Sequence, residues 1–369
     1  MRRPDLTLAA LLAVFIYAPW ASAGPSQPLA DVSTLGDPIT VDAVPELTLF
    51  PMIAKAPEAD PGYLTLDAAL DGKQLAIKET DTSGRVNTLH VTNNADRPIY
   101  ALAGEVLLGG KQDRIVGQHT LIPPGVKDFA IPVFCVEHGR WRQAGDGLEF
   151  GSAKTLAHTK LRYQAQTGQQ SNVWAEVAAS NANRKTQNDS DTYREAISKG
   201  EIMKLADPAT KALLARTATQ GQMAGVVVAI DGEVKGMDWF ASPGLYRRLE
   251  GKLIGSYVAE ALEGRASRGG EVKAAEATPK AAQTFVNDAD TAHVRAEKAS
   301  GQGKVFDFEG AEVEGSMVVD APEAAPVHRS YFKKSPAPVQ VQEQMQEQRQ
   351  MRQYSPTSIP NFEPVEQRR

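Results

Sequence analysis

Short apolar runs separated by turn residues fill the chain from Leu47 to Cys135. The runs at 47–53, 74–79, 88–92, 99–103 and 128–135 have the length and composition of β-strands, and clusters of Asn, Asp, Pro and Gly stand between them. A helix-start signal at Thr65 interrupts this series. We therefore predict a β-rich first half, built as a sandwich-like or curved mixed sheet.

After residue 141 the pattern becomes helical. Residues 154–162, 173–183, 191–199 and 207–215 are helix-compatible, and Ser242-Pro243 opens a strongly periodic apolar stretch. Asp231-Gly232 between apolar runs predicts a β-hairpin, on which that last helix should dock. Runs at 305–308, 315–319 and 327–332 could return as closing strands. The fold class predicted is α+β, as one domain over 45–332 with a β-rich N-terminal half and a helix-rich half that contains a β-hairpin.

Both ends of the chain have a different character. Residues 1–23 combine two Arg, a short apolar run and Ala21-Ser22-Ala23, which predicts a secretory signal peptide and a periplasmic or secreted protein; an uncleaved anchor is the alternative. No membrane span is expected after cleavage, because no later run approaches the ~20 apolar residues that a span needs. Residues 24–44 show no clear period and are predicted to be a lead-in segment. Residues 333–369 are Gln/Pro-rich and predict a disordered tail, or alternatively a short element that binds a protein partner.

Charge and cysteine content exclude some classes. The chain has 40 basic and 45 acidic residues, and loss of two Arg and one Asp with the signal peptide moves the net charge from -5 to -6. This acidic balance argues against nucleic-acid binding, which needs a basic surface. The single cysteine allows no intramolecular disulfide, so the fold must depend on its hydrophobic core.

Chemically capable side chains are concentrated in two segments, 104–114 and 132–141. Five cations against three acids between Gly109 and Arg142 favour an anion or nucleotide pocket, because arginine binds phosphate or carboxylate bidentately and Trp141 or Trp174 could stack on a base or sugar. The alternative is a fold-holding network, in which acidic residues of these segments pair internally with the arginines.

More specific chemistry is disfavoured. A Walker A loop would need glycine at the position of Glu105 and Ser or Thr at the position of Gln112, so the motif does not fit. Gly109-Gly110 more simply supply a turn or bulge with positive φ. Such a turn is compatible with an anion-binding nest of backbone amides. Cys135 and His138 fall on opposite faces of a strand, and the neighbouring carboxylate would raise the thiol pKa. The spacing of Cys, Glu and His matches no zinc pattern, so no metal site is predicted and the cofactor is unknown.

Several motifs together carry a family resemblance. Gly104-Glu105, the Gly-Gly-Lys-Gln-x-Arg run at 109–114, the Cys-Val-Glu-x-Gly-Arg-Trp run at 135–141, Gln170-x-x-Val-Trp174 and the run at 225–232 resemble the ARG and Rhodanese-Phosphatase-superfamily-associated Protein domain family over about residues 45–263. The resemblance implies association with ADP-ribosylglycohydrolase and rhodanese-phosphatase proteins, a hint toward nucleotide or phosphoester chemistry. It implies no catalytic mechanism.

The resulting hypothesis is an exported protein that binds, and as an enzyme would hydrolyse, a small phosphorylated or nucleotide-like ligand. As an enzyme it would use Glu137 or Glu105 as general base, with Cys135 as a further catalytic candidate and the arginines stabilising the anion. The alternative is a non-catalytic structural or protein-interaction module. The predicted ligand-binding residues are Gly109, Gly110, Lys111, Gln112, Arg114, Arg140, Trp141, Gln170 and Trp174.

Overall fold

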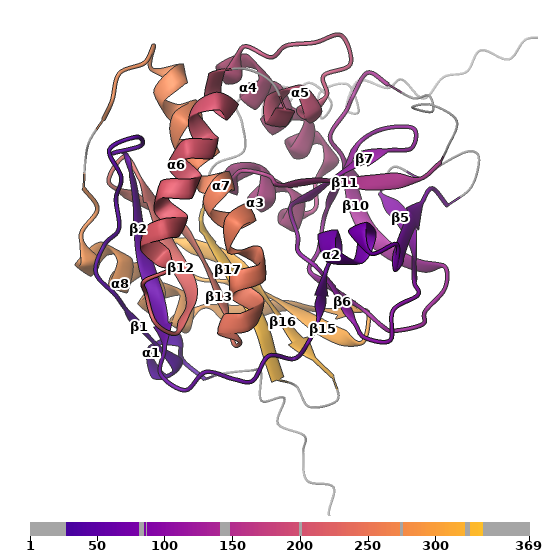
Figure 1. Cartoon of the computed structure of the whole chain (residues 1–369), viewed down its shortest axis with the longest axis horizontal. Helices are drawn as coiled ribbons and strands as arrows, with labels where there is room; N and C mark the ends of the chain where they lie inside the picture. Colours follow the sequence, from indigo (N-terminus) through magenta and orange to yellow (C-terminus); the bar gives the residue numbers. More distant parts are fainter. Residues whose placement is uncertain are drawn as a thin grey trace, which may run out of the picture.

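The computed structural model describes residues 27–80, 85, 87–140, 148–198, 201–273, 276–321 and 325–334. It confirms the α+β class, with strands in the first half, helices after them and strands again at the end (Figure 1). No helix in the described ranges is long and apolar enough to cross a membrane. The predicted signal peptide and almost all of the predicted C-terminal tail lie outside these ranges.

An antiparallel eight-stranded sheet forms one half of the molecule. The predicted hairpin lies at its centre and turns through Asp231 and Gly232, both with positive φ (55° and 79°), as a type I′ turn requires. The three closing runs near the C-terminus are strands of the same sheet. Its strand order is β1 (Ser33–Leu35), β2 (Leu47–Ala54), β12 (Met223–Ile230), β13 (Glu233–Phe240), β17 (Ala325–Lys333), β16 (Val313–Asp320), β15 (Gly303–Glu309) and β14 (His293–Ser300).

Helices cover both faces of this sheet. On one face lie α6 (Glu201–Thr217) and α7 (Pro243–Ser267), and on the other lies α8 (Pro279–Thr291). The side chain of Ser242 caps α7 by accepting a hydrogen bond from the Leu245 amide at 3.4 Å. Leu245 and Leu249 are buried with Val226 and Val228 of β12, so the predicted docking of this helix on the hairpin is confirmed.

The second half is a small β-barrel. Its six strands are ordered β11 (Phe150–Leu156), β7 (Glu105–Gly109), β8 (Arg114–Val116), β10 (Phe129–Cys135), β5 (Thr88–Asn93) and β4 (Leu75–Lys78). A bridge from Lys78 to Glu149 and a hydrogen bond from the Glu79 amide to the Leu148 carbonyl (3.1 Å) join β4 back to the start of β11. The curved sheet predicted from the sequence is therefore joined back to its first strand at this point.

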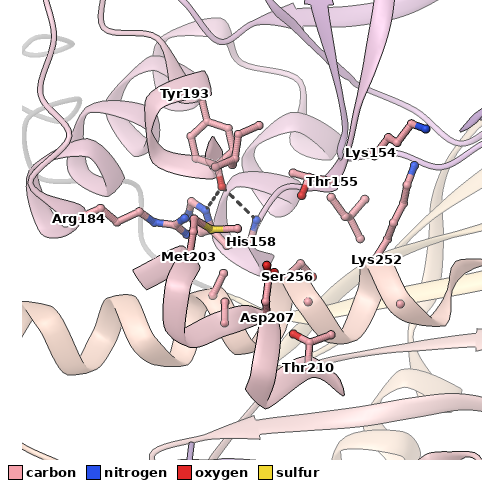
Figure 2. A pocket seen from close by; sticks show the side chains of 16 residues that line it. Lys154, Thr155, His158, Arg184, Tyr193, Met203, Asp207, Thr210, Lys252 and Ser256 are labelled. Carbon is pink, nitrogen blue, oxygen red and sulfur yellow. Dashed lines mark hydrogen bonds between the residues drawn. The ribbon is translucent and has the colours of Figure 1, made fainter. Parts of the chain in front are cut away.

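Short elements connect the two halves. A three-stranded sheet of β3 (Leu64–Thr65), β6 (Ile99–Ala101) and β9 (Thr120–Ile122) has α2 (Leu66–Asp71) after its first strand, and Tyr100 and Leu121 of this sheet are buried in the same core cluster as α7. Helices α3 (Thr159–Thr167), α4 (Gln170–Arg184) and α5 (Tyr193–Ser198) follow the barrel, and α4 contacts both β10 and α7. Residues of β11, α5, α6 and α7 surround the pocket shown in Figure 2.

Part of the predicted lead-in segment also belongs to the fold. Residues 29–35 form α1 (Leu29–Val32) and β1, which pairs with β2. Leu29 is fully buried, and its amide donates to the Asp290 carboxylate at 2.7 Å. Elements of three and four residues are too short to show a period in the sequence, so pattern alone could not reveal them.

A buried carboxylate on β13 links most of these elements. Asp238 receives two hydrogen bonds from Arg162 of α3 (2.9 and 2.7 Å), one from His328 of β17 (2.9 Å) and one from the Tyr257 hydroxyl of α7. On its other side, His328 contacts the hydroxyl of Tyr100 at 2.8 Å, which carries the chain of contacts into β6. Each of these five residues is at most 1% exposed. Burial by itself would raise the pKa of Asp238, but Arg162 and His328 hold it well below its usual value, so the carboxylate stays ionised.

This geometry predicts a large effect of Asp238→Asn. The change leaves the Arg162 guanidinium buried without its counter-charge, which should lower the free energy of unfolding by about 3–5 kcal/mol. Asp231→Asn is a matched control in the same hairpin, because its pair with Arg268 is partly exposed and should contribute less than about 1 kcal/mol. Urea titration of both variants measures the difference. Equal losses would contradict the central role of Asp238.

Candidate functional site

The two segments singled out in the sequence lie side by side. Strand β8 pairs with β10, and Cys135 stands directly opposite Arg114. Strand β7 pairs with the other side of β8 through Val106 and Leu107. The two segments are therefore neighbours in one sheet.

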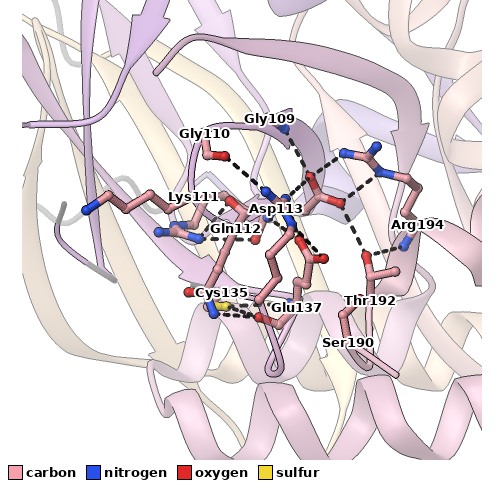
Figure 3. A network of polar contacts seen from close by, with 12 residues as sticks. Gly109, Gly110, Lys111, Gln112, Asp113, Cys135, Glu137, Ser190, Thr192 and Arg194 are labelled. Atoms are coloured by element: carbon pink, nitrogen blue, oxygen red, sulfur yellow. Dashed lines mark hydrogen bonds and ion pairs between the residues drawn. The ribbon is translucent and has the colours of Figure 1, made fainter. Parts of the chain in front are cut away.

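Asp113 is the centre of the polar network in this region (Figure 3). It is fully buried, and its two oxygens accept hydrogen bonds from Nη2 and Nε of Arg194 at 2.6 and 2.9 Å. The Gly109 amide (3.0 Å) and the Thr192 hydroxyl (3.2 Å) also donate to it. Arg194 lies in α5, so Asp113 joins the barrel to the helices. The sequence alone assigns no role to either residue, because their separation of 81 positions leaves no local signal.

Glu137 and Arg140 form a second, adjoining pair. Arg140 donates from Nε and Nη2 to the Glu137 carboxylate at 2.8 and 2.6 Å, and from Nη1 to the Gly110 carbonyl at 3.1 Å. The Asp113 amide donates to the same carboxylate at 3.1 Å. Burial would raise the pKa of Glu137, but Arg140 and the Asp113 amide lower it overall. A carboxylate so occupied is poorly suited to act as a general base near neutral pH.

The amide and thiol groups of the motif are also turned inward. Gln170 of α4 makes two hydrogen bonds to the backbone of Cys135, at 2.9 and 2.8 Å, and Gln112 donates to the Glu137 carbonyl at 2.7 Å. The Cys135 thiol donates to the same carbonyl at 3.0 Å. It is fully buried, and burial raises its pKa, which disfavours a reactive thiolate. The ring of Trp174 lies 4.4 Å from that of His138, centroid to centroid.

The two glycines form the turn that the sequence favours. Gly109 and Gly110 have φ angles of 138° and 49°, where L side chains are strained. A Cβ atom at Gly109 would lie 2.3 Å from the Glu149 carbonyl oxygen, and one at Gly110 would lie 2.3 Å from the Phe150 ring. The amide of Lys111 donates to Glu79 at 3.1 Å. The turn thus packs closely against the start of β11.

Two further residues predicted at the site, Arg114 and Glu105, are also buried. Arg114 donates to the Gln112 carbonyl at 2.8 Å and lies 3.6 Å from the Glu79 carboxylate. Glu105 contacts Lys252 of α7 at 2.5 Å and accepts from the Leu102 amide at 2.9 Å. Burial raises the pKa of Glu105, and Lys252 limits the rise. Trp141, also predicted at the site, lies outside the described residues.

A cleft of about 180 Å³ lies between the end of β11 and helices α5, α6 and α7. Lys252 is one of its lining residues. Figure 2 shows Arg184 on one side of the cleft and Lys154 and Lys252 on the other. Asp207 is the one acidic side chain among the described residues that line it. The small residues Gly251, Gly255 and Ala259 of α7 leave room for the cleft, and hydroxyl groups are supplied by Thr155, Tyr193, Thr210 and Ser256.

A buried histidine forms part of the cleft wall. His158 is 2% exposed, and its ring nitrogens contact the Glu176 carboxylate at 3.0 Å and the Tyr193 hydroxyl at 2.8 Å. Burial alone would lower its pKa, but Tyr193, Glu263 and Glu176 raise it well above its usual value. The direction of this shift favours the protonated imidazolium form of His158. No local sequence pattern connects this histidine with chemistry, because its partners come from other helices.

Arg184 has an unused hydrogen-bond donor at the same wall. Its Nε donates to Glu263 at 2.7 Å and its Nη1 to the Ala196 carbonyl at 2.8 Å. Its Nη2 is buried and has no hydrogen-bond acceptor in the described part of the chain. Glu176 and Glu263, the counter-charges of His158 and Arg184, are not among the residues that line the cleft. Arg184 and His158 thus line the cleft, whereas the acids that pair with them do not.

The comparison with protein families decides the identity. A family model, the ARG and Rhodanese-Phosphatase-superfamily-associated Protein domain (ARPP-1), matches residues 34–332. The chain belongs to this family. No curated protein and no solved structure matches the chain. The match extends beyond the 45–263 of the sequence resemblance, so the ARPP-1 domain includes the barrel, the large sheet and the cleft between them.

The paired charges of the ARPP-1 motif predict a structural effect of Arg140→Ala. The change leaves Glu137, 4% exposed, without its guanidinium, and should lower the free energy of unfolding by about 3 kcal/mol. Arg97→Ala is the control, because Arg97 is 54% exposed and pairs only with the neighbouring exposed Asp96 among the described residues. Chemical denaturation measures both. A stability loss no larger than that of the control would exclude the network as a determinant of stability.

The acid stability of the ARPP-1 domain should depend on Glu263. Burial by itself would raise the pKa of Glu263. His158 and Arg184 outweigh this effect and lower the pKa from 4.5 to about 2. The stabilising effect of Glu263 is fully present above pH 4.5 and is lost as pH falls toward 2, a change of about 3 kcal/mol. Unfolding free energies measured from pH 6 to pH 2 should therefore converge for the wild type and Glu263→Gln. A constant gap between the two curves would contradict this assignment.

Proposed function

We propose that this ARPP-1 chain binds a small oxyanion, such as inorganic phosphate or the anionic end of a small phosphorylated molecule, in the cleft between β11, α5, α6 and α7. The observation that carries the proposal is that Arg184 lines the cleft and that its Nη2 donor is buried without an acceptor among the described residues. A buried guanidinium donor without an acceptor is unfavourable, and an anionic ligand would satisfy it with a charge-assisted hydrogen bond.

The charges around the cleft support an anion over other ligands. Arg184 and the His158 imidazolium stand on one part of the wall, and Lys154 and Lys252 stand on another. Their counter-ions Glu263, Glu176, Asp71, Asp67 and Glu105 do not line the cleft. Because cationic residues outnumber the single acid among the described lining residues, an anion is the ligand that the cleft favours.

The size of the cleft narrows the ligand class. Pockets that enclose drug-sized ligands measure roughly 300–1,000 Å³. The cleft, at about 180 Å³, has room for an oxyanion or a small phosphorylated or carboxylated molecule. A nucleotide-like ligand could place only its phosphate inside. The proposal is therefore a small-anion site, which modifies the nucleotide-like ligand expected from the sequence.

Binding is proposed rather than hydrolysis. Glu105 and Glu137 are each paired with a cation, and Cys135 is buried with a raised pKa. None of the three lines the cleft. Export to the periplasm or medium remains part of the proposal and rests on the N-terminal sequence alone.

A non-catalytic interaction module is the second candidate function. The Asp113 network favours it, because most of the predicted binding residues hydrogen-bond to one another or to the backbone instead of facing solvent. In that case the motif would hold a scaffold whose partner binds elsewhere.

Calorimetric titration with inorganic phosphate tests the oxyanion site. Arg184→Lys keeps a positive charge beside Glu263 but removes the guanidinium group and its additional N–H donors. Phosphate binding should weaken about 10-fold or more, which corresponds to the loss of one charge-assisted hydrogen bond. Asp207→Asn removes the one acid among the described lining residues and should strengthen binding several-fold, a gain that misfolding cannot imitate.

The control for Asp207→Asn is Asp96→Asn, whose carboxylate is 85% exposed and does not line the cleft. It should leave phosphate affinity unchanged. Sulfate and a nucleoside monophosphate should compete with phosphate at the same site. Absence of phosphate binding to the wild type, or equal affinity in all four proteins, would reject the proposal and leave the interaction module.

A further inference from the structure

A second and larger cavity lies on the opposite face of the eight-stranded sheet from the oxyanion cleft. This groove measures about 820 Å³ and runs beside α8. Val234 of β13 and Ala281 and Phe285 of α8 form its apolar floor. Charged side chains surround the floor, namely Glu233, Lys280, Asp288, Glu312 and Lys333.

The chain leaves the described fold at the rim of this groove. Lys333, the last residue of β17, lines it. The amide of Lys334 donates to the carbonyl of Glu312 at 2.9 Å, and Glu312 also lines the groove. Residues 335–369, which lie outside the described part of the chain, therefore begin directly beside an apolar surface.

We propose that the groove is a docking site for the chain's own segment 335–342, Ser-Pro-Ala-Pro-Val-Gln-Val-Gln. Val339 and Val341 are two positions apart, so they share one face of an extended chain and can both meet the floor. Pro336 and Pro338 restrict the unbound chain and so reduce the entropy lost on docking.

Length and tethering support this occupant. Eight extended residues span about 26–29 Å, whereas the 13 residues of α8 rise about 20 Å, so the segment can run the full length of the groove. A tether this short gives an effective concentration in the millimolar range. Burial of the two valines favours docking, and the tether offsets part of the entropy that the same peptide added in trans would lose.

The absence of charge in segment 335–342 favours this groove over a neighbouring cavity as the docking site. A cavity of about 280 Å³ on the α3 side also reaches the end of β17, and charged residues dominate its lining, namely Lys160, Glu233, Lys235, Glu260, Lys333 and Lys334. Residues 335–342 carry no charge, so they would gain no ionic contact with this lining. The apolar groove beside α8 is the better match.

Paramagnetic broadening in the intact chain, expressed from Gly24, tests the docking. Gln340→Cys provides a site for a nitroxide, and the native Cys135 does not compete because it is fully buried. The amide signals of Thr284 and Asn287 should lose about half or more of their intensity, because the tethered segment is bound most of the time. Broadening around Lys160 instead, or no broadening on α8, would overturn the proposal.

Two matched substitutions test whether the valine side chains make the contact with the groove. Val341→Asp should abolish the broadening of Thr284, and Gln342→Asp, with the same charge on the opposite face, should preserve it. Equal effects of the two would reject the apolar contact. Broadening that rises with protein concentration would show that the groove accepts the segment of a second copy, which also contradicts docking within one chain.

Discussion

Asp238 is an ionised carboxylate in the interior, and its donors come from three different elements, α3, α7 and β17. Taking such a charge out of water is unfavourable unless several donors reach it with good geometry. Because each donor must lie within hydrogen-bonding distance of Asp238, this requirement fixes where the elements that carry the donors pack against β13. The contact of His328 with Tyr100 extends the same constraint to the three-stranded sheet. The cleft lined by Arg184 depends on this arrangement, because His158 directly precedes α3 and Lys252 belongs to α7.

Two kinds of buried charge network coexist in this ARPP-1 chain. Around Asp113 the network is closed at its carboxylates, since arginines, amides and a hydroxyl occupy Asp113 and Glu137, while the adjacent Arg114 has two buried guanidinium nitrogens without an acceptor in the described part of the chain. Around Arg184 the network is open beside a cleft, since one guanidinium nitrogen of this lining residue has no acceptor among the described residues. Closed networks stabilise a fold, whereas an unsatisfied donor beside a cavity is a place where a ligand can bind. Dense functional chemistry in a sequence motif can therefore mark the scaffold, with the site on sparser sequence nearby.

Much of the fold followed from local patterns. The Asp231-Gly232 turn and the Ser242-Pro243 helix start each depend on residues close together in the chain, and both were predicted correctly. Closure of the barrel was not predicted, because the bridge from Lys78 to Glu149 joins distant positions. The positive φ angles of Gly109 and Gly110 confirmed the turn expected there. Glu79 and Arg194 were missed as partners of the motif, since long-range pairing leaves no period or spacing to read.

The sequence by itself determined the α+β class, the family and the places where strands turn and helices begin, because these are properties of neighbouring residues. Only the tertiary structure decided which charges are paired and which face a cavity, because that depends on side chains from separate elements meeting in a water-poor interior. His158 and Arg184 show the difference. Neither has a local signature, yet each is buried at one wall beside partners that the chain brings from α4, α5 and α7.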